Sequence, residues 1–113
     1  MTSLPLRLPN EPVKIAFEAE LWLWDAKRAD TWMFVSLPVD DSAEIRALAA
    51  ELGRRAASLR ARATIGGSTW ETSIFSDPEK GYVLQVDRTV RETESLKVGD
   101  VAGVTVELLD LAR

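Results

Sequence analysis

The sequence contains no cysteine and no histidine among its 113 residues. Without cysteine there are no disulfides, thiolate metal ligands or thiol nucleophiles. Without histidine there is no imidazole metal ligand and no histidine-based proton relay. We therefore expect no metal and no cofactor, and we consider an enzyme the least supported class of function.

The chain is also poor in positive charge and lacks long apolar runs. It has 14 Lys and Arg against 18 Asp and Glu, a net charge of -4, which disfavours binding to nucleic acid through overall charge. No apolar run approaches the roughly 20 residues of a membrane helix, and the proline-rich residues 1–12 do not resemble a signal peptide. We expect a cytoplasmic protein that binds neither membranes nor nucleic acid.

Length and composition are those of a single globular domain. With 46% hydrophobic residues, a chain of this length can bury one modest core. We assign residues 1–12 to an N-terminal lead-in and residues 13–113 to one β-barrel domain.

Apolar residues alternate with polar ones over residues 13–24, which predicts the first strand. Residues 31–37 are rich in β-forming side chains, and we expect this second strand to pair antiparallel with the first. The period then becomes helical. Asp41 and Glu44 have the spacing of a capping box, and the apolar residues that follow predict a helix over residues 42–57.

The Gly66-Gly67 pair predicts a hairpin, because a two-residue primed turn requires positive φ. A β-branched residue in place of Gly67 should therefore damage folding. The turn also fixes the register, which puts small residues opposite large ones on one face and opposite charges on the other. The expected pairs are Ile65 with Ser68, Ala63 with Trp70, Ala61 with Thr72, Leu59 with Ile74, Arg62 with Glu71 and Arg60 with Ser73.

The last third of the chain predicts a strand at residues 82–86, a short helix at 87–95, a tight turn at Gly99-Asp100 and a strand at 101–108. Together these elements indicate a mainly β fold. We expect a small closed barrel of roughly six strands, largely antiparallel, with one long helix after the second strand and a short helix before the last.

Several short motifs, ordinary one by one, occur in a characteristic order. They are Phe17 and Leu21, the run from Trp32 to Pro38, Ile65-Gly66-Gly67, the run from Trp70 to Ser73, Gly81-Tyr82, Arg91 and Gly99-Asp100. In this order they resemble the bacterial domain of unknown function family 1905, from about residue 15 to residue 109. The resemblance implies a small barrel similar to the double-split barrel of AbrB-type and MazE-type proteins, and it implies no activity. The family's Leu-Pro is replaced here by Gln85-Val86.

Arg91 is the centre of the candidate ligand site. An arginine in a short helix beside polar strand residues offers donors only, and it can bind a carboxylate or phosphate through two hydrogen bonds. Alternatively, it pairs with a neighbouring carboxylate, and the tryptophans belong to the core. The candidate ligand-binding residues are Arg91, Tyr82, Thr72, Ser73, Trp70 and Trp32.

A basic cluster forms the second candidate site. It could contact phosphate or nucleic acid, although neighbouring glutamates favour a solvated, salt-bridged face. The basic patch candidates are Arg54, Arg55, Arg60 and Arg62.

We therefore expect a binding or interaction module for a small anionic ligand or a protein partner. The alternative is a nucleic-acid-binding regulator of AbrB-like type. Trp22 and Trp24 lie on the polar face of the first strand and need a cover. The lead-in, the long helix or a second copy of the chain could supply that cover, so we expect a monomer or a homodimer.

Overall fold

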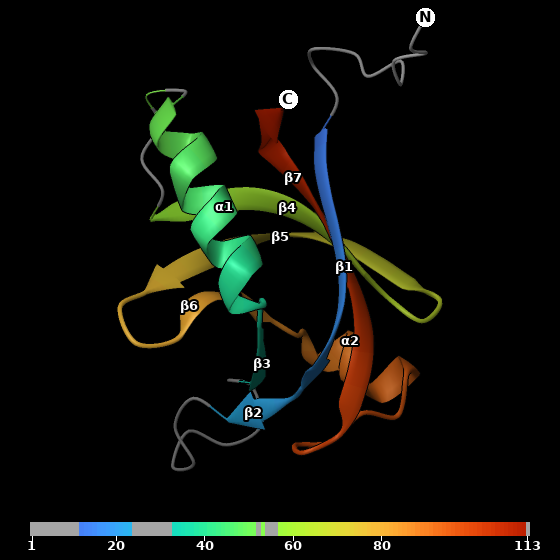
Figure 1. Cartoon of the computed structure of the whole chain (residues 1–113). Coiled ribbons are helices and arrows are strands. Elements are labelled where there is room, and N and C mark those ends of the chain that lie inside the picture. The colour runs from blue at the N-terminus through green and yellow to red at the C-terminus, as the bar shows by residue number, and fades with distance from the viewer. Residues whose placement is uncertain (1–11, 24–32, 52, 54–56, 113) are drawn as a thin grey trace, which may run out of the picture.

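Seven strands in the described part of the chain form one antiparallel sheet (Figure 1). The computed structural model describes residues 12–23, 33–51, 53 and 57–112. The strand order is β1-β7-β4-β5-β6-β3-β2. The elements are β1 (Pro12–Glu20), β2 (Trp22–Leu23), β3 (Met33–Ser36), α1 (Val39–Glu51), β4 (Ser58–Ile65), β5 (Ser68–Asp77), β6 (Gly81–Gln85), α2 (Arg88–Thr93) and β7 (Val101–Ala112).

The sheet curls because its two edge strands are neighbours in the chain. Only Leu21 separates β1 from β2, and β1 and β2 lie at opposite ends of the strand order. The backbone N–H of Leu21 donates to the carbonyl of Asp100 at 2.9 Å, and that of Gly99 donates to the carbonyl of Leu21 at 2.8 Å. These bonds hold the corner where the chain passes from one edge of the sheet to the other.

The predicted mainly β fold is confirmed, but the prediction of a closed barrel of roughly six strands is wrong, because the sheet of the described residues is an open half-barrel of seven strands. Along its nine residues β1 pairs with β7, and only Trp22 and Leu23 pair with β3. The predicted pairing of the first two strands therefore holds only for β2.

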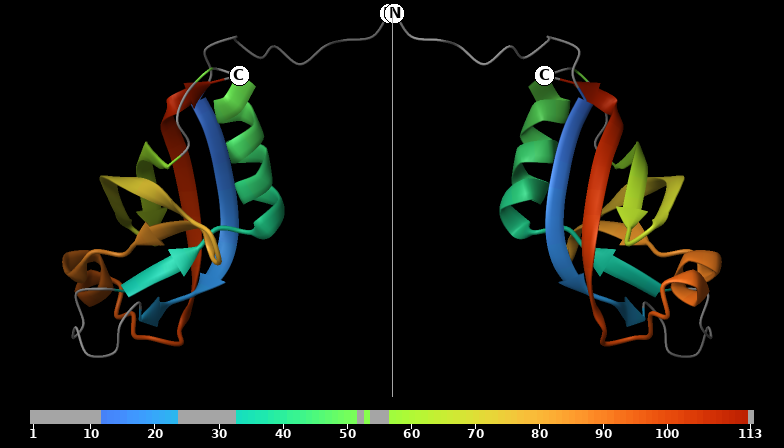
Figure 2. Two further views of the ribbon diagram at one scale, coloured as in Figure 1. Left: turned by 90° about the vertical axis from the view of Figure 1, so that its left-hand side faces the viewer. Right: turned by 90° about the vertical axis from the view of Figure 1, so that its right-hand side faces the viewer.

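In both views of Figure 2, α1 lies on one side of β1, and β7 and β4 lie on the other.

The long helix begins earlier than the sequence predicts. It runs from Val39 to Glu51, and the N–H of Ser42 donates to the carbonyl of Pro38 at 2.9 Å. Pro38 thus ends the strand region and accepts the first helical hydrogen bond, so Asp41 lies inside the first turn. A carboxylate in this turn is stabilised by the helix dipole without acting as the predicted cap.

The β4–β5 hairpin confirms the predicted register at every pair, from Ile65 with Ser68 to Leu59 with Ile74. The turn differs in one detail. Gly66 has a φ of +58°, whereas Gly67 is not among the residues with positive φ. Positive φ at the first central residue alone is typical of a type II′ turn. The prediction that Gly67 needs positive φ is therefore wrong, and Gly66 carries that requirement.

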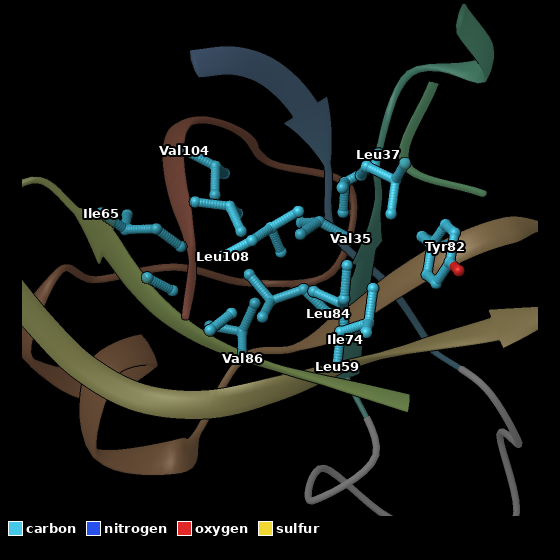
Figure 3. Packing of buried hydrophobic residues seen from close by; sticks show 14 of the residues in the cluster. Val35, Leu37, Leu59, Ile65, Ile74, Tyr82, Leu84, Val86, Val104 and Leu108 are labelled. Carbon is cyan, nitrogen blue, oxygen red and sulfur yellow. The ribbon is translucent and has the colours of Figure 1, made fainter. Parts of the chain in front are cut away.

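The core lies on the inner face of the sheet. Every second residue of β4 is buried, and Figure 3 shows several of these side chains together with those of β5, β6 and β7. Full burial of one such aliphatic side chain stabilises the fold by roughly 1.5–3 kcal/mol. The largest fully buried side chains are Tyr82, Leu21, Ile45, Leu59, Ile74, Leu84, Leu108, Leu111, Val35, Val83, Val86 and Val104.

A valine at Gly66 should destabilise the protein far more than a valine at Gly67. At Gly66 a Cβ would overlap the carboxylate of Glu94, and a β-branched residue resists positive φ. We expect Gly66→Val to lower the free energy of unfolding by about 2 kcal/mol or more. Urea denaturation of the two variants measures this difference, and equal losses would refute the turn assignment.

Candidate functional site

Arg91 is a buried cation on α2, with only 6% of its surface exposed. Its Nε donates to the carbonyl of Val86 at 3.2 Å, which ties α2 to the end of β6. Its Nη2 is enclosed and has no hydrogen-bond partner in the described part of the chain. A buried N–H without an acceptor costs about 1–3 kcal/mol, and more when the group is charged. One N–H group of the guanidinium, Nη2, therefore lacks an acceptor among the described residues, while Nε has one.

A shallow, open depression of about 320 Å³ adjoins Arg91. Most of its lining side chains are cationic or polar. Arg88 and Glu92 form an ion pair at 3.2 Å across one helical turn, and both are exposed. The lining residues are Arg88, Arg91, Glu92, Ser95, Leu96 and Lys97.

The segment after α2 is held in a Schellman motif. The N–H of Leu96 donates to the carbonyl of Arg91 at 2.8 Å, and that of Ser95 donates to the carbonyl of Glu92 at 3.3 Å. Ser95 has a φ of 57° in the position that glycine usually occupies. This motif folds the chain back, so that the residues after the helix line the same depression as Arg91.

Trp70 lies at the same end of the sheet as α2. Glu94, just after α2, accepts a hydrogen bond of 2.7 Å from the hydroxyl of Ser68 at the start of β5. Trp70 follows two residues later on the same face of that strand. Its Nε1 is enclosed and, like Nη2 of Arg91, has no partner in the residues described.

Thr72 and Ser73 cannot line one pocket together, because successive strand residues point to opposite faces. Thr72 shares the face of Trp70 and lies opposite Ala61, whereas Ser73 lies opposite Arg60 on the other face. Of these two candidates, only Thr72 faces the interior of the half-barrel.

Tyr82 is fully buried on β6, at some distance from α2. Its backbone N–H donates to the hydroxyl of Ser42 at 3.1 Å, and the guanidinium of Arg46 lies 5.5 Å from the ring centroid. Its partner in β5 is Ser76, six residues from Trp70, or roughly 20 Å along the strand. Tyr82 therefore packs against α1. Trp32 lies outside the described residues.

The two described members of the predicted basic patch, Arg60 and Arg62, are paired with carboxylates. Arg60 bonds to Asp110 through its backbone N–H at 2.8 Å and through Nε at 3.1 Å. Arg62 contacts Glu107 at 3.0 Å and Glu71 at 3.4 Å. These contacts fit the salt-bridged face that the sequence allowed as the alternative. Arg54 and Arg55 lie outside the described residues.

Trp22 is covered by neighbouring parts of the same chain. Its ring stacks on Phe34 with centroids 5.4 Å apart, and its Nε1 donates to the hydroxyl of Ser36 at 3.0 Å. The ammonium group of Lys80 lies 5.4 Å from the ring centroid. The cover therefore includes β3 and Lys80, neither of which is among the three covers expected from the sequence. Trp24 lies outside the described residues.

Of the six residues that line the depression, only Arg91 was predicted as a site residue. The five that were missed are Arg88, Glu92, Ser95, Leu96 and Lys97. The usual signal for a helix end of this kind is a glycine, and here a serine takes its place. The charge of Lys97 was visible in the sequence, but only the Schellman motif places it beside Arg91.

The fold defines the class of protein, a mainly β domain built on an open half-barrel. The sequence profile of a family described as a domain of unknown function (DUF1905) matches residues 17–106. The chain belongs to this family. A search of curated proteins finds no match. Neither described helix is long and apolar enough to cross a membrane.

Ser95→Gly should stabilise the protein by about 1 kcal/mol, because glycine adopts positive φ without the strain that a side chain causes. Ser95→Val should destabilise it. Thermal denaturation of the two variants checks this expectation. A glycine variant less stable than wild type would mean that the serine side chain compensates for its own strain.

Tyr82 should make stability fall at alkaline pH. Burial raises the pKa of its phenol above the ordinary value of 10.0, and Arg46 partly lowers it. Between the two pKa values the unfolded chain loses its proton and the folded chain keeps it, so stability is lost as pH rises above about 10. Tyr82 is the chain's one tyrosine, so tyrosinate absorbance reports it directly.

The matched variant Tyr82→Phe should lack this component of the alkaline loss of stability. If the tyrosine of the folded protein titrates at its ordinary value, the assignment of the effect to burial is wrong.

Proposed function

We propose that this protein is a non-enzymatic binding module whose depression beside α2 takes a small anionic ligand. One observation carries the proposal: the guanidinium of Arg91 is almost completely buried, and its Nη2 has no acceptor among the described residues. An isolated buried charge is strongly unfavourable, so such groups are normally paired. Arg91 lines the adjoining depression, so an anion bound there would lie beside the guanidinium and compensate its charge.

The chemistry of the lining favours an anion over other ligands. Arginine has five N–H donors and no acceptor, and it matches carboxylate and phosphate groups geometrically. A second enclosed donor, Nε1 of Trp70, lies at the same end of the sheet. The chain has no histidine or cysteine for proton transfer or nucleophilic attack, which supports binding over catalysis.

The alternative of a nucleic-acid-binding regulator receives less support. Phosphate contacts require cations that are free to exchange their counterions. The carboxylates of Asp110, Glu107 and Glu71 already pair with Arg60 and Arg62. Among the described residues, no specific contact therefore favours this alternative.

Nuclear magnetic resonance of the ¹⁵N-labelled protein tests the proposal. Titration with inorganic phosphate at constant ionic strength should shift the Nε–H signal of Arg91 and the amides of residues 95–97 in a saturable way. The indole signal of Trp70 should shift with them. Shifts that stay linear in concentration, or that spread over the whole surface, would overturn the proposal.

A pair of matched variants separates the site from general charge effects. Arg91→Lys keeps the charge but loses the planar fork, and it should weaken phosphate binding by about tenfold or more. Arg62→Lys makes the same change in an exposed, paired arginine and should leave binding unchanged. Equal effects of the two variants would show that binding does not occur at Arg91.

A further inference from the structure

We infer that the ligand of this depression is a small phosphate monoester, bound as its dianion. The inference rests on the proposed function and adds a ligand class. Of the four charged side chains in the lining, Arg88 and Glu92 neutralise each other. Arg91 and Lys97 have no carboxylate partner among the described residues. The depression therefore presents two uncompensated positive charges.

The fold places these two charges together and holds them there. The hydrogen bond from Leu96 to the carbonyl of Arg91 closes the Schellman motif, and Lys97 follows directly. The backbone N–H of Lys97 donates to the Asp100 carboxylate at 2.9 Å, and the N–H of Asp100 donates to the carbonyl of Lys97 at 3.0 Å. The position of Lys97 is therefore fixed by the backbone on both sides.

Glu92 is the one carboxylate among the residues that line the depression, and it pairs with Arg88. Glu94 accepts a hydrogen bond from the hydroxyl of Ser68 and Asp100 accepts one from the N–H of Lys97, and neither carboxylate lines the depression. A monoanion would leave one of the two cations uncompensated, whereas a dianion matches both. At neutral pH a phosphate monoester is largely a dianion with three acceptor oxygens, because its second pKa is about 6.

The remaining lining suits the ester part of such a ligand. Ser95 offers an exposed hydroxyl at the rim, and Leu96 offers a half-buried apolar surface. A volume of about 320 Å³ lies at the lower end of the range for small-molecule sites. The site therefore fits a small monoester better than a larger ligand.

Calorimetric titration with methyl phosphate and methyl sulfate tests the ligand class, because the two are nearly isosteric and differ in charge. At pH 8 and constant ionic strength, methyl phosphate should bind at least about tenfold more tightly. At about pH 5 the phosphate monoester is a monoanion, and the two affinities should converge. Equal affinities at pH 8, both lost in Arg91→Lys, would overturn the ligand class and leave the proposed function standing.

Lys97→Gln supplies the matched variant, since Lys97 is exposed and its removal leaves the backbone bonds in place. It should reduce the affinity for methyl phosphate to that for methyl sulfate and change the latter little. An unchanged preference for phosphate would overturn the role of the second charge.

Binding of neither ester by the wild type would overturn the proposed function itself. Co-sedimentation with vesicles that carry phosphatidic acid, without binding of methyl phosphate, would assign the site to a lipid head group instead.

Discussion

The corner at Leu21 is the constraint on which the rest of the structure depends. This residue is fully buried, and its two backbone hydrogen bonds join the junction of β1 and β2 to Gly99 and Asp100. Because the junction joins the two edges of the open sheet at one corner, the sheet must curl around a core. The same bonds anchor the turn that positions Lys97. The corner therefore links the curvature of the sheet to the geometry of the depression beside α2.

The parts of the fold that could be predicted from the sequence are those that depend on neighbours in the chain. The β4–β5 register followed from two glycines and a period of two, and the structure confirms each pair. The pairing of β1 with β7 joins residues about 90 positions apart, and no local pattern encodes such a contact. The open sheet could not be predicted for the same reason.

The candidate site was predictable to a similar extent. Arg91 stood out because it is a donor-only group in a predicted short helix beside polar strand residues, and it lines a depression. Residues adjacent in sequence, such as Thr72 and Ser73, were assigned to one site although a strand separates them onto two faces. The grouping of Arg91 with Lys97 depends on a Schellman motif that lacks its usual glycine.

Two residues near the end of α2 thus adopt locally unfavourable states. The buried Arg91 has one N–H group, Nη2, without an acceptor among the described residues, and Ser95 takes a backbone conformation that suits glycine. Each costs about 1 kcal/mol or more in a small protein whose total stability is of the order of 10 kcal/mol. Proteins usually satisfy local preferences except where a site requires otherwise. The coincidence of both costs at one depression is therefore an argument for function that is independent of the charge count.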